Sequence, residues 1–577
     1  MRVRHLAALS ATAALLVAAA PLPTISLTEA PVAETVTSTA TRLLPSASGV
    51  LAGDLGPAPS GGAIEAATEI LAVHADALGV DADDFAFDHV RVSDIGTHVR
   101  GAEVRDGVAV HGTSAAVHVV DGRVVKVEAR GSDLPGTAAQ ASIGEAAATM
   151  AALTATGVTQ TVVEPHVERL LVTDGGVLRD VHRVTLTSLA PAVAAAVDVD
   201  TATGAVLAIH DTRQHADEHG HDAGQSDSEA LVFFPNPVVM GGEVIRQVGH
   251  HPLETFVDSD ISLEADALLT PMAVRDYDTA LAAAGNLSGP WVDVLGPGSY
   301  ADGAWPVTKS DPRFEGVNVY VNIDTIQRYF QDELGLFEVN AEPQLAIAFP
   351  VVGFDNAFYQ PGNDLLFFGA GGVDDGEDAD VVIHELGHAI HDDQVPGWGA
   401  RAEGGAMGEG FGDLLAGLYF ARTHGAEGIH CFADWDGTAI QTDHDPCLRP
   451  NDDDTRMWPE DKANQVHQDG EMWSAFVTRL APRLLDGEEW SMISRADALD
   501  AMTLEDHVEA ADRALHLLLS SHELLSPTAE FVDAIDALLQ AAELTLSDEA
   551  EVARYQDMIR LTAAETTMPY SGAPWVD

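Results

Sequence analysis

The chain has 577 residues, enough for about three to four domains of usual size. Hydrophobic residues make up 46% of it, which predicts a globular rather than a disordered protein. Acidic residues outnumber basic ones by 91 to 29, giving a net charge of −62, and the only lysines are Lys126, Lys309 and Lys462. This charge repels nucleic acid and anionic membranes and argues against both as partners. Calcium binding, a saline medium and a general compositional bias all fit the acidity, and composition does not separate them.

The first residues predict export. Arg2 and Arg4 precede an apolar run from Leu6 to Val17 and a small-residue stretch, which is typical of a signal peptide over residues 1–20. No later stretch approaches the roughly 20 apolar residues that span a bilayer, so we expect a secreted, extracellular protein without a membrane anchor. In an exported chain the two cysteines, Cys431 and Cys447, are expected to form a disulfide.

The first ordered part is predicted to be a small α+β region. Residues 21–60 are rich in Ala, Thr, Ser and Pro and are interpreted as a flexible lead-in. From Thr97 to Arg130 the pattern alternates, with hairpin turns at 106–107 and 121–122, and predicts an antiparallel sheet. Ser142 and Glu145 have the spacing of a capping box before an Ala-rich helix. Further strands are expected up to Leu207.

A polar segment, residues 210–228, follows and is predicted to be a processing linker, because cleavage concentrates in flexible polar segments. Its His215, His219 and His221 are either metal-binding or, as an exposed acidic linker favours, simply solvated.

From Glu229 the pattern predicts a mixed α/β part followed by a helical one. Asp324 is expected to cap a helix over Asn322–Gln331 that stops near Gly335. Strands are expected around residues 346–352 and 365–368. From Arg479 onward the spacing is helical, including one apolar face formed by Phe531, Ile535, Leu538 and Leu539 and a further helix over residues 549–561.

A short motif, His384-Glu385-Leu386-Gly387-His388, lies between these two parts. Histidines four apart lie on one face of a helix and can converge on a single ion, Zn²⁺ in this pattern. Glu385 between them fits a general base rather than a ligand.

A third zinc ligand is expected downstream, because catalytic zinc usually takes three protein ligands and one water. Glu409 is the best candidate, and Asp413, four residues later, could accept the free N–H of a zinc-bound histidine. These two acids precede an apolar stretch, residues 414–420, that predicts a second helix. The alternative is an ordinary acidic first turn of that helix.

These motifs resemble the thermolysin and fungalysin group of zinc endopeptidases. Gly408-Glu409-Gly410-Phe411-Gly412-Asp413 is similar to the fungalysin version, with Phe411 and Gly412 where Trp and Ser are usual. Residues 466–473 resemble the block whose histidine, here His467, faces the substrate carbonyl. Residues 356–359 resemble the edge strand that holds substrate backbone, here through Asn356 and Ala357. The stretch between His388 and Glu409 contains no tyrosine; Trp398 is the nearest aromatic.

The resemblance implies a two-lobed α+β zinc peptidase, residues 229–577, preceded by a propeptide. Residues 61–135 resemble the fungalysin/thermolysin propeptide module and residues 136–209 a PepSY module; a generic α+β accessory domain is the alternative. The expected activity is endopeptidase cleavage of protein or peptide substrates, with the propeptide as inhibitory partner in cis. Arg449 either holds a substrate carbonyl or braces a loop.

Calcium is a weaker expectation from the same resemblance. Asp380 resembles a calcium ligand of thermolysin-like enzymes, and oxygen donors surround it in the sequence at Asp374, Asp375, Glu377 and Asp378. A solvated acidic loop is the alternative. Two other functions are alternatives. One is a catalytically silent secreted metal- or peptide-binding protein, and the intact Glu385 argues against it. The other is a membrane-anchored or cell-wall structural protein, against which stand the absence of an anchor segment and of repeats in the sequence.

Overall fold

The computed structural model describes residues 49–574 except 139–140, 190–191, 212–224, 242–265, 301–304, 353–355, 438–446, 487–498 and positions 94, 162, 297, 372, 400 and 454. The chain divides into residues 1–40, which are outside this description, and residues 41–577. The predicted export signal, most of the predicted lead-in and most of the predicted linker therefore lie outside the described residues.

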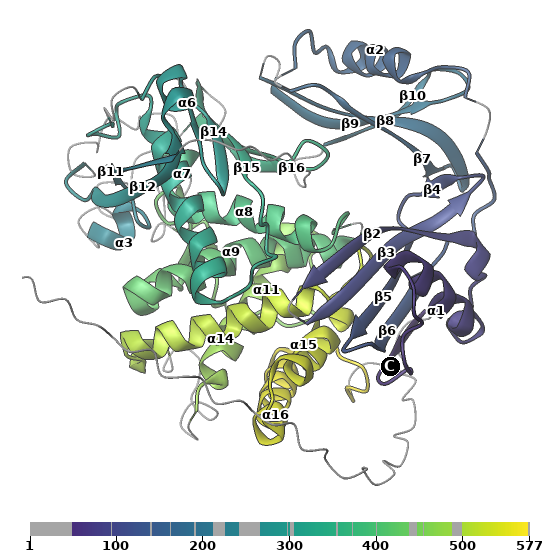
Figure 1. The fold of residues 1–577 in the computed structure, drawn as a ribbon. Coiled ribbons are helices and arrows are strands. Elements are labelled where there is room, and N and C mark those ends of the chain that lie inside the picture. The colour runs from purple at the N-terminus through teal and green to yellow at the C-terminus, as the bar shows by residue number, and fades with distance from the viewer. Residues whose placement is uncertain are drawn as a thin grey trace, which may run out of the picture. The chain divides into compact units, whose positions relative to one another are not determined.

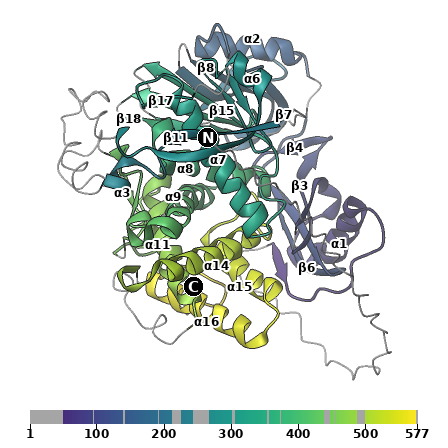
Figure 2. The same cartoon turned by 60° about the vertical axis from the view of Figure 1, so that its left-hand side comes forward.

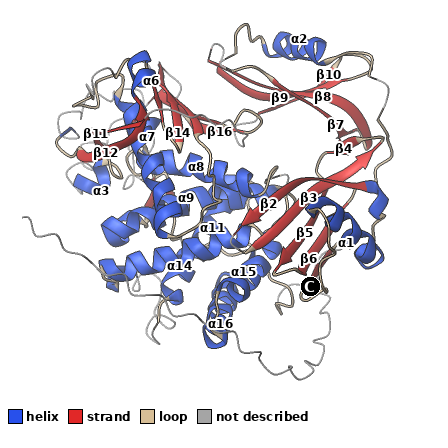
Figure 3. Ribbon diagram, in the orientation of Figure 1, coloured by secondary structure: helices blue, strands red, loops and turns tan. Residues whose placement is uncertain are grey.

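Strands dominate the N-terminal part (Figures 1 and 3). Its elements are β1 (Val50–Ala52), α1 (Ala63–Leu78), β2 (Phe85–Ser93), β3 (Gly96–Arg105), β4 (Val108–Val110), β5 (Ser114–Val120), β6 (Arg123–Arg130), α2 (Glu145–Thr156), β7 (His166–Asp174), β8 (Val177–Leu189), β9 (Ala192–Asp200) and β10 (Val206–Asp211). They form one sheet in the order β1-β6-β5-β3-β4-β7-β8-β9-β10, with β2 beside β3. The first half of the sheet and α1 enclose one hydrophobic core. The second half and α2 enclose another. The two halves are joined by parallel pairing of β4 with β7.

The predicted hairpin turns are present. Asp106 and Gly107 have φ of 53° and 79°, and Asp121 and Gly122 have φ of 48° and 73°. Positive φ at both central residues is the conformation that Asp-Gly favours between two antiparallel strands.

Two local predictions in this part differ from the structure. Val50–Ala52, inside the predicted lead-in, pairs with β6, so ordered structure begins before residue 60. The helix cap is Gly144 and not Ser142. The backbone amide of Ser142 instead donates to the carbonyl of Thr201 (2.8 Å).

A second sheet forms the centre of the next part. The elements are β11 (Gln225–Val232), α3 (Pro237–Gly241), β12 (Thr270–Asp278), α6 (Thr279–Ala284), β13 (Asn286–Ser288), β14 (Val292–Leu295), α7 (Phe314–Arg328), β15 (Gln344–Val352), β16 (Ala357–Gln360), β17 (Leu365–Gly371), β18 (Val373–Asp374) and α8 (Ala379–Gln394). The sheet order is β13-β14-β15-β17-β16, and α7 and α8 pack against it. Strand β11 begins at Gln225, inside the predicted linker, and pairs with β12.

The predicted helix over Asn322–Gln331 is longer than expected. Helix α7 begins at Phe314, so Asp324 lies in its interior, where it forms an ion pair with Arg328 (2.9 Å) instead of capping the helix. The chain continues from α7 as a π-helical turn over Tyr329–Glu333.

Helices dominate the remainder of the chain (Figure 3). They are α9 (Ala402–His424), α11 (Val466–Leu480), α14 (Leu504–His522), α15 (Phe531–Thr545) and α16 (Glu549–Thr566), with a short ladder of β19 (Cys431–Phe432) and β20 (Arg449–Pro450). Cys431 and Cys447 form the predicted disulfide. Helix α9 contacts α8, α11 and α14, as the turned view of Figure 2 also shows.

The fold class is therefore α+β, as predicted: a sheet-bearing region followed by a helical one, with α8 at their junction. One large core extends across this junction, from the β14–β15 strands to α16. None of the described helices is long and apolar enough to cross a membrane.

Candidate active site

Helix α8 carries the histidine pair. Asp378 caps its N-terminus by accepting a hydrogen bond from the amide of Asp380 (3.0 Å). His384 and His388 are one turn apart and almost fully buried, and their Nε2 atoms are 3.1 Å apart. Two imidazole nitrogens in such contact within a helix are arranged to share one ion.

Helix α9 brings the carboxylate of Glu409 to the same point. Its Oε2 lies 3.5 Å from Nε2 of His384 and its Oε1 lies 3.8 Å from Nε2 of His388. Three ligand atoms each about 2.0–2.1 Å from a tetrahedral zinc ion would be about 3.3 Å from one another. The donors and their spacing therefore fit zinc, and the three residues form one of the buried groups able to hold a metal.

Glycines permit the close approach of α8 and α9. A Cβ added at Gly387 would lie 3.0 Å from the Cα of Gly412, and one added at Gly412 would lie 2.5 Å from Nδ1 of His384. The second value is far below ordinary contact, so Gly412 leaves the space in which the His384 ring lies. The sequence contained this signal in the glycines at positions 404, 405, 408, 410 and 412. It was missed because glycine disfavours helix interiors, which also explains why the predicted helix began too late.

A second glycine contact sets α11 against α9. A Cβ at Gly410 would lie 2.3 Å from the carbonyl oxygen of Gly470. This crossing puts His467, in the first turn of α11, with its Nε2 3.2 Å from Oε2 of Glu409. The His467 side chain is 46% exposed, so it faces both the metal-binding group and solvent.

Asp413 and Arg449 orient His384 from behind. Oδ1 of Asp413 lies 2.8 Å from Nδ1 of His384, the nitrogen that does not face Glu409. Arg449 donates to both oxygens of Asp413, at 2.7 and 2.6 Å, and its guanidinium lies over the ring of Phe432. Of the two predicted roles for Arg449, the structure shows the bracing contact.

Electrostatics separates the two glutamates. Burial raises the pKa of Glu385 to about 7, which suits a group that accepts and returns a proton. Glu409 is equally buried, but hydrogen bonding to His384 and the charges of His388 and His467 hold its pKa well below the ordinary value. Glu409 is therefore the carboxylate that stays ionised as a ligand. Burial opposes the charge on His384, yet Asp413 and Glu409 raise its pKa to about 9.

Comparison with known proteins agrees with this geometry. Residues 370–557 match the family model for the fungalysin metallopeptidases (M36). Among solved structures, the precursor of protealysin, a metalloproteinase from Serratia proteamaculans, is similar over 44% of this chain and 81% of its own, with 16% identity and a TM-score of 0.32. No curated protein matches the chain.

An edge strand borders the candidate active site. Strand β16 pairs only with β17 in the described sheet, and it packs against α8. Asn356, just before it, is exposed, and Ala357 is its first residue. The structure therefore places Ala357 on this edge strand and Asn356 directly before it, beside α8.

Trp398, the aromatic residue between His388 and Glu409 in the sequence, takes part in the core and not in the site. Its ring stacks on His391 with 4.5 Å between centroids, and its Nε1 donates to the carbonyl of Gly404 (2.6 Å). Phe411 stacks on the other side of His391, and Nε2 of His391 lies 3.4 Å from that of His522. His391 therefore contacts α14 and takes part in the packing between helices.

The predicted calcium residues do not form one group. Asp380 clusters with Asp378 and Asp434, all buried, because the cap at Asp378 turns the helix start toward the loop after α9. Asp374 and Glu377 instead cluster with Glu315 on α7.

The two acidic groups differ in whether a cation of the protein lies beside them. The ammonium of Lys309, fully buried, lies 3.1 Å from Oε2 of Glu377, so the second group already has a cation. Asp375 Oδ2 accepts from the amide of Gly369 (3.1 Å). In the first group, burial and the charges of Asp378 and Asp434 raise the pKa of Asp380 well above its ordinary value. A bound divalent cation would relieve that repulsion.

Proposed function

We propose that this chain is a secreted zinc endopeptidase made as an inactive precursor. The observation that carries the proposal is the His384, His388 and Glu409 group, whose donor atoms have the spacing of a tetrahedral zinc site. Bound zinc would polarise the scissile carbonyl and make water acidic enough to lose a proton near neutral pH.

The chain's own residues carry the remaining steps. Glu385 accepts the proton of the attacking water and passes it to the leaving amine. His467, at the solvent-facing side of the group, donates to the oxyanion and so acts mainly in the transition state. Asp413 and Arg449 hold His384 in the tautomer that presents Nε2. Strand β16 adds the substrate backbone at its open edge through Asn356 and Ala357.

Residues 61–135 and 136–209 form the propeptide in this proposal, and cleavage within residues 212–224 separates them from the peptidase. In this proposal the propeptide also includes the strand that begins at Val50, and the peptidase part includes the strand that begins at Gln225. N-terminal sequencing of the secreted active enzyme tests this. An active form that still carried β3 covalently would contradict cleavage as the activating step.

Glu385→Gln tests the catalytic proposal. We expect hydrolysis of casein to fall by orders of magnitude while zinc content and thermal stability stay near those of the wild type, because only the base is lost. Glu333→Gln, an exposed partner of Arg422, is the matched control and should keep full activity. Wild-type hydrolysis by the Glu385→Gln variant would exclude the mechanism.

A further inference from the structure

Four basic residues lie opposite one another across the N-terminal sheet. Arg91 on β2 faces His98 on β3, His98 faces His118 on β5, and His118 faces Lys126 on β6. We call these four residues the basic row; all are buried. Like charges in directly opposite positions destabilise a sheet, so the row accommodates its two end cations only while the two histidines are neutral.

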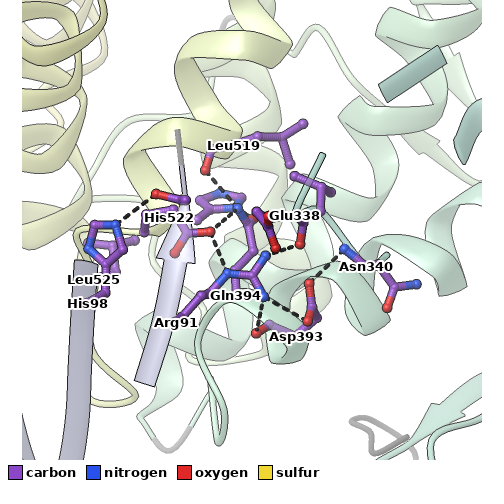
Figure 4. A network of polar contacts seen from close by, with 12 residues as sticks. Arg91, His98, Glu338, Asn340, Asp393, Gln394, Leu519, His522 and Leu525 are labelled. Carbon is purple, nitrogen blue, oxygen red and sulfur yellow. Dashed lines mark hydrogen bonds and ion pairs between the residues drawn. The ribbon is translucent and has the colours of Figure 1, made fainter. Parts of the chain in front are cut away.

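The basic row ends on the C-terminal end of α14 (Figure 4). Nε of Arg91 donates to Oε1 of Glu523 (2.7 Å), and Nζ of Lys126 donates to the carbonyl of Leu524 (2.5 Å). Arg100, two residues along β3, donates to the carbonyl of Glu523 (2.9 Å). The last carbonyls of a helix lack partners within the helix and carry partial negative charge. The N-terminal sheet therefore supplies cationic donors to a helix end.

The Arg91 guanidinium also connects the helical region with α8 and the second sheet. It donates to Oδ1 of Asp393 (2.8 Å), near the end of α8, and to the carbonyl of Glu338. The other oxygen of Asp393 accepts from the amide of Asn340 (2.7 Å), before β15. Figure 4 shows Arg91 in contact with Asp393, and Asp393 in contact with Asn340.

The two histidines form a buried pair. Their Nδ1 atoms are 2.9 Å apart, and Nε2 of His98 lies 2.8 Å from Oγ of Ser93. One Nδ1 must donate and the other accept, so the contact is lost when both rings are protonated. Burial lowers the pKa of both rings well below the ordinary value, and the neighbouring cations, including Arg100 and, for His118, Lys126, lower it further.

We propose that the end of α14 and the turn after it, residues 522–528, are a releasable docking site for the N-terminal module, residues 49–130, which leaves when His98 and His118 take up protons. The proposal rests on the proposed function for its meaning, because the module is the propeptide there. The N-terminal module would then be held at neutral pH and freed in acid.

The direction of the pH dependence of docking follows from which state, docked or released, binds protons more readily. The docked histidines resist protonation and the released ones do not, so the docking free energy is fully present above the ordinary histidine pKa of about 6.5 and falls as pH drops below it. His89, opposite Arg100, has its pKa lowered by burial and acts in the same direction.

Three carboxylates also lie beside the basic row. They are Glu128, paired with Lys126 at 3.2 Å, Asp393 and Glu523. Burial raises the pKa of Glu523, which favours docking in acid and so opposes the histidines. Because an ordinary glutamate has a pKa of about 4.3, the test stays above about pH 5.5, where histidine titration dominates.

Hydrogen exchange of the full chain carrying Glu385→Gln, followed by mass spectrometry, measures the docking without any hydrolysis. Between about pH 8 and about pH 5.5, and after correction for intrinsic rates, peptides from β3, β5 and residues 519–528 should lose protection together. His98→Gln with His118→Gln should shift that midpoint down by roughly one pH unit or more. His74→Gln, on α1 of the same module, is the matched control and should leave it unchanged. Failure of the wild type to open, or opening of the double variant at the wild-type pH, would overturn the proposal.

A crosslink separates undocking from unfolding. Oγ of Ser114 and Oγ1 of Thr528 are 2.9 Å apart, so Ser114→Cys with Thr528→Cys can join the two surfaces. The joined chain should stay protected in acid, and loss of protection there would mean unfolding and would also overturn the proposal.

A pair of arginine variants tests the docking contacts at neutral pH. Arg100→Met should expose residues 522–528, whereas Arg123→Met, whose partner Asp54 is exposed, should not. Casein hydrolysis by the wild-type chain, which keeps Glu385, tests the proposed function. It does not depend on any of these docking measurements.

Discussion

At the scale of single residues, the site separates groups of one chemical type by their surroundings. His388 and His391 are one turn apart on α8, yet the first faces Glu409 and the second lies between Trp398 and Phe411. The aromatic stacking and the contact with His522 make His391 part of the packing between helices. Zinc binding should therefore depend on His388 and Glu409 and not on His391.

Alanine variants at three positions test this assignment. Glu409→Ala should abolish stoichiometric zinc binding, because the third protein donor is lost. Asp413→Ala should weaken zinc affinity by about 10- to 100-fold through loss of the contact that orients His384. His391→Ala should retain zinc but unfold at a lower temperature, since it leaves a cavity between aromatic rings. Equilibrium dialysis with metal analysis is the measurement, and zinc kept by Glu409→Ala but lost by His391→Ala would refute the ligand set.

At the scale of elements, the site is assembled by helices that cross at glycines. The contact of Gly387 with Gly412 brings α8 to α9, and that of Gly410 with Gly470 brings α11 to α9. Each crossing puts one functional side chain against Glu409: His384 in the first case and His467 in the second.

Two alanine substitutions on α9 separate helix propensity from this packing. Alanine is favoured over glycine in a helix by about 1 kcal/mol. Gly408→Ala has ordinary contact distances of 3.6 Å or more, so it should stabilise the protein or leave it unchanged. Gly412→Ala would push against the His384 ring at 2.5 Å and should lower both thermal stability and zinc affinity. Denaturant unfolding and zinc titration measure the two effects; equal behaviour of the variants would contradict the crossing argument.

At the scale of the whole molecule, the net charge of −62 means that carboxylates repel one another, and each cation reduces that repulsion locally. All three lysines lie beside a carboxylate: Lys126 beside Glu128, Lys309 beside Glu377, and Lys462 beside Glu403. The buried Asp378, Asp380 and Asp434 group is the counterpart that we propose takes a calcium ion instead.

Calcium should therefore stabilise the folded protein. At a free concentration about 100 times its Kd, a bound ion adds about 2.7 kcal/mol to the free energy of unfolding. With zinc held constant, the Tm of the wild type should rise as calcium is added. Asp434→Asn should remove most of that rise, whereas Glu315→Gln, in the group beside Lys309, should keep it. An equal calcium response in both variants would exclude the Asp434 site.

The sequence by itself determined the residues whose function depends on local spacing. His384, Glu385 and His388 are fixed by one turn of helix, and the Asp-Gly turns by the positive φ that these residues favour. The α+β class also followed from the order of alternating and helical patterns.

Only the tertiary structure decided which distant residues meet. Asp434 joins Asp380 across more than fifty residues, Arg449 was found on Asp413, and the predicted calcium group divided because Lys309 neutralises one half. The start of helix α9 was predicted too late because glycine disfavours a helix locally. Its glycines are required by the close packing of neighbouring helices, which the sequence does not show. Local preferences act within a few residues, whereas close packing and charge compensation act between segments that the sequence does not place side by side.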